Sequence, residues 1–170
     1  MKKTLLMILL ALFLLPVVAN ALSICDYFPG KSGCFLLYNQ NQSSLLTQYN
    51  PARCAEKMPR PNDWSGADLT ISADEQLAFM KTKEAILTAK KSGYLETSPK
   101  GWKLYGKTGY SKKTEDGTSQ GWFIGFIEKA DQVYIFVLNF SDLPDPKALE
   151  GAGPRAKEIA KTLLTKMNLF

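Results

Sequence analysis

The chain has 170 residues, is 45% hydrophobic and carries a formal net charge of +5, so it is long enough for one globular domain. This charge is too mild, and the lysines too scattered, to indicate a protein that binds nucleic acid. The sequence contains no histidine, which excludes Ser-His-Asp and Cys-His catalysis and argues against a hydrolytic zinc site. We therefore expect no metal and no cofactor.

The N-terminus has the pattern of a secretory signal peptide. Two early lysines precede an apolar run over residues 5–18, and an Ala-x-Ala cleavage site ends at Ala21. The alternative is a membrane anchor, for which the apolar run is rather short. We expect a signal peptide over residues 1–21 and one domain over residues 22–170. The domain would be periplasmic, as in a Gram-negative bacterium, with no stable membrane anchor after cleavage.

Three cysteines follow this leader, and a secretory compartment would permit disulfides. Cys34 and Cys54 flank a segment with the pattern of a β-hairpin, so they are the pair that we expect if a disulfide forms. Cys25 would then be left over.

The first half of the domain shows strand signals followed by a helix signal. Residues 33–38 and 45–49 have strand composition and are separated by a polar turn, which predicts a hairpin. Residues 50–63 contain three prolines and no periodicity, so we expect an irregular segment. Ser72-Ala73-Asp74-Glu75 has the pattern of a capping box, and the apolar spacing after it predicts a helix over residues 73–91.

Three consecutive antiparallel strands are predicted next, over residues 102–109, 121–129 and 132–140. The middle strand has apolar side chains at both odd and even positions, which indicates a strand covered on both faces. A helix whose N1 position is Pro154 closes the chain. This order predicts an α+β domain, with an antiparallel sheet and flanking helices.

The triplet Lys107-Thr108-Gly109 at the end of the first of these strands carries the main functional signal. A Lys-Thr-Gly on a sheet edge lines the substrate cleft of penicillin-recognising serine enzymes. An ammonium and a hydroxyl hold an anionic acyl substrate, and the glycine lets that substrate lie close to the strand. The alternative is an ordinary hairpin turn, which the triplet alone does not exclude.

Six stretches extend this signal over most of the chain that follows the leader. They span residues 33–38, 49–55, 69–76, 101–109, 121–128 and 133–139. Together, in order and spacing, they resemble the class D, or oxacillinase-type, serine β-lactamases. The resemblance implies the sheet half of the β-lactamase/transpeptidase-like fold, with most of the helical lobe missing.

The same resemblance implies a β-lactam site. Lys107, Thr108 and Gly109 match the family's substrate-binding strand, and Arg155 matches the arginine that pairs with the substrate carboxylate. Trp64 matches the tryptophan beside the family's catalytic lysine. The alternatives are a surface arginine at position 155 and an ordinary buried aromatic at position 64. The implied partner is a β-lactam or a peptidoglycan-like small molecule, and the oligomeric state is not indicated.

The family's catalytic groups have no counterpart in the sequence. The family acylates the serine of a Ser-x-x-Lys motif whose carbamylated lysine is the general base, and no Ser-x-x-Lys occurs in this chain. The sequence passes from Pro59 to Arg60 as if the nucleophile segment were deleted, with a second gap near Met80. We therefore expect no catalytic residues and no covalent reaction, unless Ser111 serves as a substitute nucleophile. We also expect apolar side chains to be exposed where the helical lobe is missing.

Three interpretations follow from these observations. The chain is an internally deleted and inactive class D β-lactamase homologue. Alternatively, it is a non-enzymatic periplasmic protein that binds β-lactams or peptidoglycan peptides through Lys107, Thr108 and Arg155. A third possibility is an interaction domain without a ligand.

Overall fold

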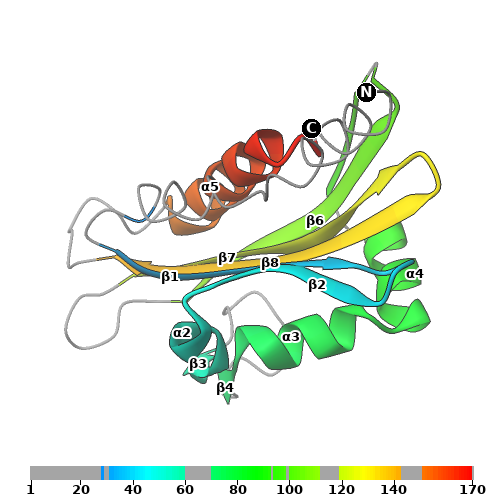
Figure 1. Ribbon diagram of the computed structural model, residues 1–170. Coiled ribbons are helices and arrows are strands. Elements are labelled where there is room, and N and C mark those ends of the chain that lie inside the picture. The colour runs from blue at the N-terminus through cyan, green and yellow to red at the C-terminus, as the bar shows by residue number, and fades with distance from the viewer. Residues whose placement is uncertain are drawn as a thin grey trace, which may run out of the picture.

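The computed structural model describes residues 28, 31–59, 70–92, 94–98, 100–111, 119–142 and 151–169. In these residues an antiparallel sheet of six strands lies between helices on its two faces (Figure 1), which confirms the expected α+β class. The leader, Cys25 and Trp64 lie outside the described residues.

The strands of the large sheet follow the order β2-β1-β8-β7-β6-β5, and each pairs antiparallel with its neighbours. Their bounds are Lys31–Asn39 for β1, Ser44–Tyr49 for β2, Tyr94–Thr97 for β5, Trp102–Ser111 for β6, Gln120–Lys129 for β7 and Gln132–Asp142 for β8. The five predicted strands are confirmed, and β5 is an addition. A small separate sheet pairs β3, Met58–Pro59, with β4, Thr70–Ile71.

The helices differ from the expected ones in three ways. They are α2 at Pro51–Ala55, α3 at Ala73–Met80, α4 at Lys83–Ser92 and α5 at Ala152–Lys166. The segment expected to be irregular contains α2, because Asn50 accepts a hydrogen bond from the amide of Arg53 and Pro51 occupies the first turn. The single helix expected over residues 73–91 is divided, since Thr82 accepts a hydrogen bond from the amide of Ala85 and starts α4. Helix α5 begins two residues before Pro154.

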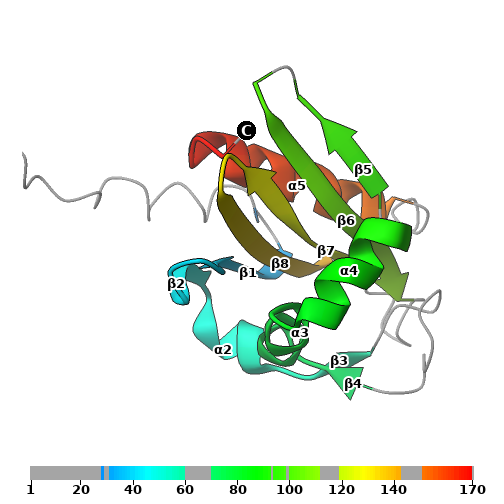
Figure 2. The same ribbon diagram turned by 90° about the vertical axis from the view of Figure 1, so that its right-hand side faces the viewer.

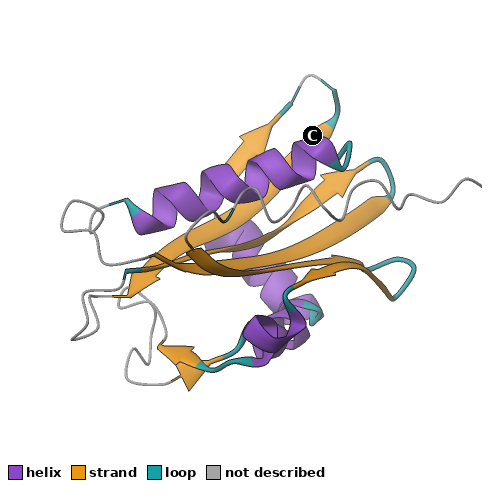
Figure 3. Ribbon diagram, turned by 60° about the vertical axis from the view of Figure 1, so that its left-hand side comes forward, coloured by secondary structure: helices purple, strands orange, loops and turns teal. Residues whose placement is uncertain are grey.

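Helices cover both faces of the sheet, as Figures 1 and 3 show, with α5 on one face and α2, α3 and α4 on the other. Phe123 and Ile127 of β7 lie in the core beneath α5, while Trp122 and Phe126 lie in the core on the opposite face. This confirms the prediction of a central strand covered on both faces. The expected exposure is wrong for the sheet itself, because Trp122 and Phe126 are 0% exposed beneath the short helices, but Phe79 of α3 and Leu87 of α4 are exposed on this side. Burying each large apolar side chain contributes about 1.5–3 kcal/mol to folding.

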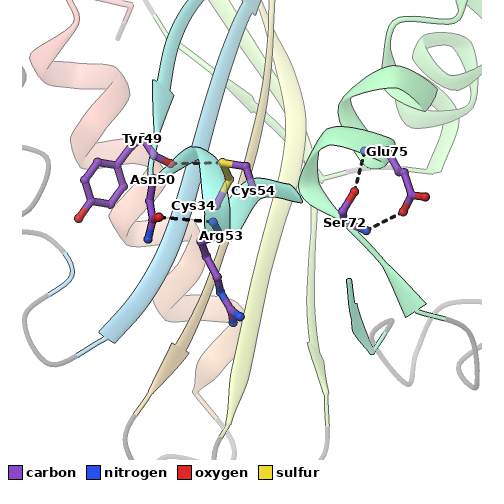
Figure 4. Close-up of a disulfide and its surroundings, with 7 residues drawn as sticks. All are labelled: Cys34, Tyr49, Asn50, Arg53, Cys54, Ser72 and Glu75. Carbon is purple, nitrogen blue, oxygen red and sulfur yellow. Dashed lines mark hydrogen bonds between the residues drawn. A yellow bond between two sulfur atoms is a disulfide. The ribbon is translucent and has the colours of Figure 1, made fainter. Parts of the chain in front are cut away.

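A disulfide attaches α2 to the sheet. Cys34 of β1 and Cys54 of α2 are bonded, with 5.1 Å between their Cα atoms, as Figure 4 shows. This confirms the expected pair. The guanidinium of Arg53 adds a second attachment, since it donates a hydrogen bond to the hydroxyl of Ser141 on β8.

The capping box at the start of α3 is confirmed. The hydroxyl of Ser72 accepts a hydrogen bond from the amide of Glu75 at 3.1 Å, and the carboxylate of Glu75 accepts one from the amide of Ser72 at 2.9 Å (Figure 4). The hydrogen bond from the Ser72 amide lowers the pKa of the Glu75 carboxyl below its ordinary value of 4.5, and Lys57 lowers this pKa further.

This lowered pKa predicts a pH-dependent contribution to stability. Because the folded-state pKa of Glu75 lies below its unfolded value, the charged carboxylate stabilises the fold above pH 4.5, and this contribution disappears as the pH falls through the folded-state pKa. Urea unfolding between pH 7 and pH 3 should show wild type more stable than Glu75→Gln at neutral pH, with a gap that closes in acid. The variant Glu84→Gln, in the first turn of α4, is the control. A gap that persists unchanged at pH 3 contradicts the prediction.

Candidate functional site

The triplet Lys107-Thr108-Gly109 lies inside β6, which excludes the alternative of a hairpin turn. Strand β7 pairs with β6 along its whole length, but β5 pairs with it only from Lys103 to Gly106. The pairing of β5 with β6 therefore ends at Gly106, and among the described residues the outer edge of β6 has no strand partner from Thr108 to Ser111. An open strand edge presents backbone donors and acceptors to a ligand that lies alongside it.

The first turn of α5 packs directly against this triplet. A methyl group added at Gly153 would lie 3.3 Å from both the Cβ of Thr108 and the carbonyl oxygen of Gly109. The absence of a side chain at Gly153 thus lets the helix approach the strand closely. Farther along α5, Lys161 donates hydrogen bonds to both carboxylate oxygens of Glu96 on β5, at 2.9 Å each. The helix is therefore fixed over β5 and β6.

Arg155 lies on this same first turn of α5, so the structure brings its backbone close to the triplet. Its amide donates a hydrogen bond to the carbonyl of Gly151 at 2.8 Å. Its guanidinium carbon lies 5.5 Å from the centroid of the Phe140 ring. Phe140 belongs to β8, two strands away from β6 in the sheet. The role of Arg155 as a partner for a carboxylate stays a prediction, as does the role of Trp64.

A cavity of about 390 Å³ lies between β6 and α5. Its walls combine Lys107 and Thr108 of β6 with Pro154, Lys157 and Glu158 of α5. The ammonium of Lys157 and the hydroxyl of Thr108 can hold an anion here, while the carboxylate of Glu158 favours a cation or a hydrogen-bond donor. Sequence reasoning missed Lys157 and Glu158, although they follow Pro154 by about one helical turn.

A second cavity, of about 150 Å³, lies on the other side of β6, against α3 and α4. Lys107 lines both cavities, and its side chain lies on this face of the sheet, because it pairs with Ile124, which belongs to the core on this face. Nothing in the linear sequence connected Phe79, Met80 or Ala85 of these helices to the triplet.

The described part of the chain contains no group of three or more Cys, Asp or Glu side chains that could hold a metal ion. In that same part, no helix is both long enough and apolar enough to cross a membrane.

The triplet and the sheet suggest a relationship to a known family, and a comparison with family models shows which family it is. The family model described as "Penicillin binding protein transpeptidase domain" matches residues 78–165, which is about half of the chain. The chain belongs to the penicillin-binding transpeptidase family. The match runs from α3 to α5 and includes Lys107, Thr108, Gly109 and Arg155.

Within this family the chain is homologous to class D β-lactamases. It is 32% identical over 115 residues to "Probable beta-lactamase YbxI" of Bacillus subtilis, covering 63% of this chain and 39% of the relative. It is 31% identical over 123 residues to "Beta-lactamase OXA-1" of Escherichia coli, covering 62% of this chain and 41% of the relative. The chain thus spans about two fifths of the length of these two relatives.

The fold of this chain is also similar to that of solved structures in the same family of folds. The C-terminal domain of the Bacillus licheniformis BlaR penicillin-receptor matches with a TM-score of 0.69 and 21% identity, covering 86% of this chain and 95% of that domain. At this identity the likeness establishes the fold alone.

Proposed function

We propose that this chain is a class D β-lactamase homologue that binds β-lactams or peptidoglycan-like small molecules without hydrolysing them. One observation carries the proposal: a Lys-Thr-Gly triplet lies on an open strand edge against α5, in 170 residues that contain no Ser-x-x-Lys. Acylation needs an activated nucleophile and a base, so their absence leaves recognition as the function that the site can perform.

Each residue of the site has a proposed part in recognition. The ammonium of Lys107 and the hydroxyl of Thr108 would hold the anionic end of the ligand, and Gly109 would let the ligand lie along the strand. Arg155 would exchange its contact with the ring of Phe140 for a paired contact with the ligand carboxylate. Trp64 would add an aromatic wall.

We further propose that residues 1–21 are a signal peptide and that residues 22–170 act in the periplasm as an internally shortened class D homologue. The Cys34–Cys54 disulfide supports an oxidising compartment. The chain spans only about two fifths of the length of its two relatives, which supports the proposal that it is internally shortened.

The first test is intact-mass spectrometry of the purified chain after incubation with excess benzylpenicillin. We expect no covalent adduct but saturable binding of benzylpenicillin by isothermal titration calorimetry. The variants Thr108→Val and Arg155→Gln should each weaken binding about ten- to hundred-fold, which is the loss expected for one hydrogen bond to a charged group. Lys166→Gln, in the last turn of α5, is the control and should bind as wild type does.

Two outcomes would overturn the proposal. A mass increase of one penicillin would mean that a serine is acylated, with Ser111 as the first residue to examine. A sample that is folded by circular dichroism but binds no benzylpenicillin would point to an inactive relic without a ligand.

A further inference from the structure

The two edges of the large sheet differ in charge. Strand β2 forms one edge and β5 the other, and Figure 2 shows them on opposite sides of the sheet. Strand β5 carries Glu96, whose carboxylate accepts hydrogen bonds from Lys161. Strand β2 has no charged residue and no proline, and the whole segment 32–52 is free of charged residues. Charges and prolines are what usually keeps the unpaired backbone of an edge strand from pairing with another chain. The β2 edge lacks this protection.

Two neighbouring leucines are exposed on this edge strand. Leu45 and Leu46 are 47% and 46% exposed, so a large part of each apolar side chain contacts water. Leu46 is the extra residue of a β-bulge, since Leu45 pairs with Tyr38 and Thr47 with Leu37. A bulge interrupts the regular backbone of an edge, so it limits pairing with another chain to a short stretch. Covering the two leucines would remove apolar surface from water and favour association.

Strand β2 is held in place at both ends. At the β1–β2 turn, Nδ2 of Asn41 donates a hydrogen bond to the carbonyl of Asp131 at 2.9 Å, and its Oδ1 accepts one from the amide of Val133 at 2.8 Å. At the other end, the ring of Tyr49 stacks on the ring of Phe28, with 5.3 Å between their centroids. A partner would therefore meet a strand that is already ordered, so association would cost little further conformational entropy.

A second copy of this chain is the partner that this edge fits. Two copies of an edge strand can pair antiparallel about a twofold axis, because each then presents the same backbone donors and acceptors to the other. The chain carries a net charge of +5, so two copies repel one another, and the repulsion is smallest where they meet through an uncharged surface. The β2 edge is such a surface, whereas a charged partner would find no opposite charge on it.

We propose that two copies of the chain associate through their β2 strands, which pair antiparallel and bring Leu45 and Leu46 of each copy against the other. Because both copies use the same edge, the contact is closed and the product is a dimer rather than a fibre. Three strands separate β2 from β6, so the candidate site of each copy lies at the far edge of the sheet from the contact.

The small size of the contact predicts a weak dimer. A contact limited to one short strand and its side chains is smaller than the about 1,200–2,000 Å² that stable protein complexes bury. We therefore expect a dissociation constant of about 10–100 μM. Sedimentation velocity of the purified chain over a range of concentrations around that value should show a reversible equilibrium between monomer and dimer.

A charge placed in the contact should weaken the dimer. Leu46→Lys is expected to raise the dissociation constant at least about ten-fold, because the twofold axis brings the two introduced ammonium groups close together. Leu46 is already 46% exposed, so the lysine can reach water in the monomer. Leu95→Lys is the matched control, at 51% exposure on the β5 edge, and it should dimerise as wild type does.

A mixing experiment separates a lost contact from a misfolded variant. Leu46→Lys and Leu46→Glu should each associate weakly alone, while an equimolar mixture should form a mixed dimer, because opposite charges then face each other. Native mass spectrometry distinguishes the mixed dimer from the two parents. The proposal is overturned by a chain that stays monomeric at about ten times the expected dissociation constant. It is equally overturned by growth into larger assemblies, by a dimer that Leu95→Lys weakens as much as Leu46→Lys does, or by a mixture that forms no mixed dimer.

Dimerisation and the proposed ligand binding are tested independently. Leu46→Lys should bind benzylpenicillin as wild type does, and Arg155→Gln should dimerise as wild type does, because the two residues lie at opposite ends of the strand order. A chain that binds benzylpenicillin but stays monomeric refutes the dimer and leaves the proposed function standing. A chain that dimerises but binds no benzylpenicillin refutes the proposed function alone.

Discussion

Replacing Gly125 with alanine is expected to prevent folding, or to lower the free energy of unfolding by about 4 kcal/mol or more. The added Cβ would lie 1.9 Å from the carbonyl oxygen of Tyr105 and 2.7 Å from the Cα of Gly106. Both atoms belong to the backbone of β6, which is held between β5 and β7 in the sheet. A flexible side chain could move away at little cost, but this backbone cannot.

The consequence reaches the candidate site, because Gly106 directly precedes Lys107. Gly125 and Gly106 are partners in the register of β6 and β7, so a methyl group at Gly125 pushes on the strand where the triplet begins. Any variant molecules that fold should therefore carry a displaced triplet and bind the site's ligand more weakly.

Urea unfolding followed by tryptophan fluorescence measures the effect. Gly151→Ala is the matched control, because its added methyl would meet only Nε of Arg155, at 3.8 Å, and the backbone φ of −112° suits an alanine. We expect this control to cost about 1 kcal/mol or less, the usual range for alanine at a helix N-cap. A Gly125→Ala protein whose stability lies within that range would show that β6 and β7 separate easily.

The parts of the fold that could be predicted are those whose signal is local. The strands β7 and β8 are long runs rich in β-branched and aromatic residues, and the four residues of the capping box from Ser72 to Glu75 mark the start of α3. The pairing of Cys34 with Cys54 followed from their positions around one hairpin. The triplet is likewise a contiguous motif.

The parts that could not be predicted depend on contacts between distant segments. Helix α2 has five residues, too few to be stable alone, and it is held by the disulfide and by the hydrogen bond from Arg53 to Ser141. Strand β5 exists as the partner of β6. The two cavities that share Lys107 join residues from three or four elements, so no spacing in the sequence marks them.

Removal of the Cys34–Cys54 disulfide is expected to lower the free energy of unfolding by about 3 kcal/mol. The bridged residues are 20 positions apart, and closing a loop of that length restricts the unfolded chain by roughly this amount. In the folded state the same bridge attaches α2 to β1, next to the core beneath α3. Its loss should therefore also loosen the cover over Leu36 and Trp122.

The double variant Cys34→Ala/Cys54→Ala, compared with Cys25→Ala in urea unfolding, isolates this contribution because the control replaces a cysteine but keeps the Cys34–Cys54 bridge. Both bridged cysteines are 0% exposed, so a dithiol reductant should reduce wild type only as fast as the chain opens. Alkylation followed by mass spectrometry reads out that rate. A double variant as stable as the control, or a bridge that is reduced while the tryptophan fluorescence stays native, would mean that α2 is a detachable cover and that the sheet holds its core without it.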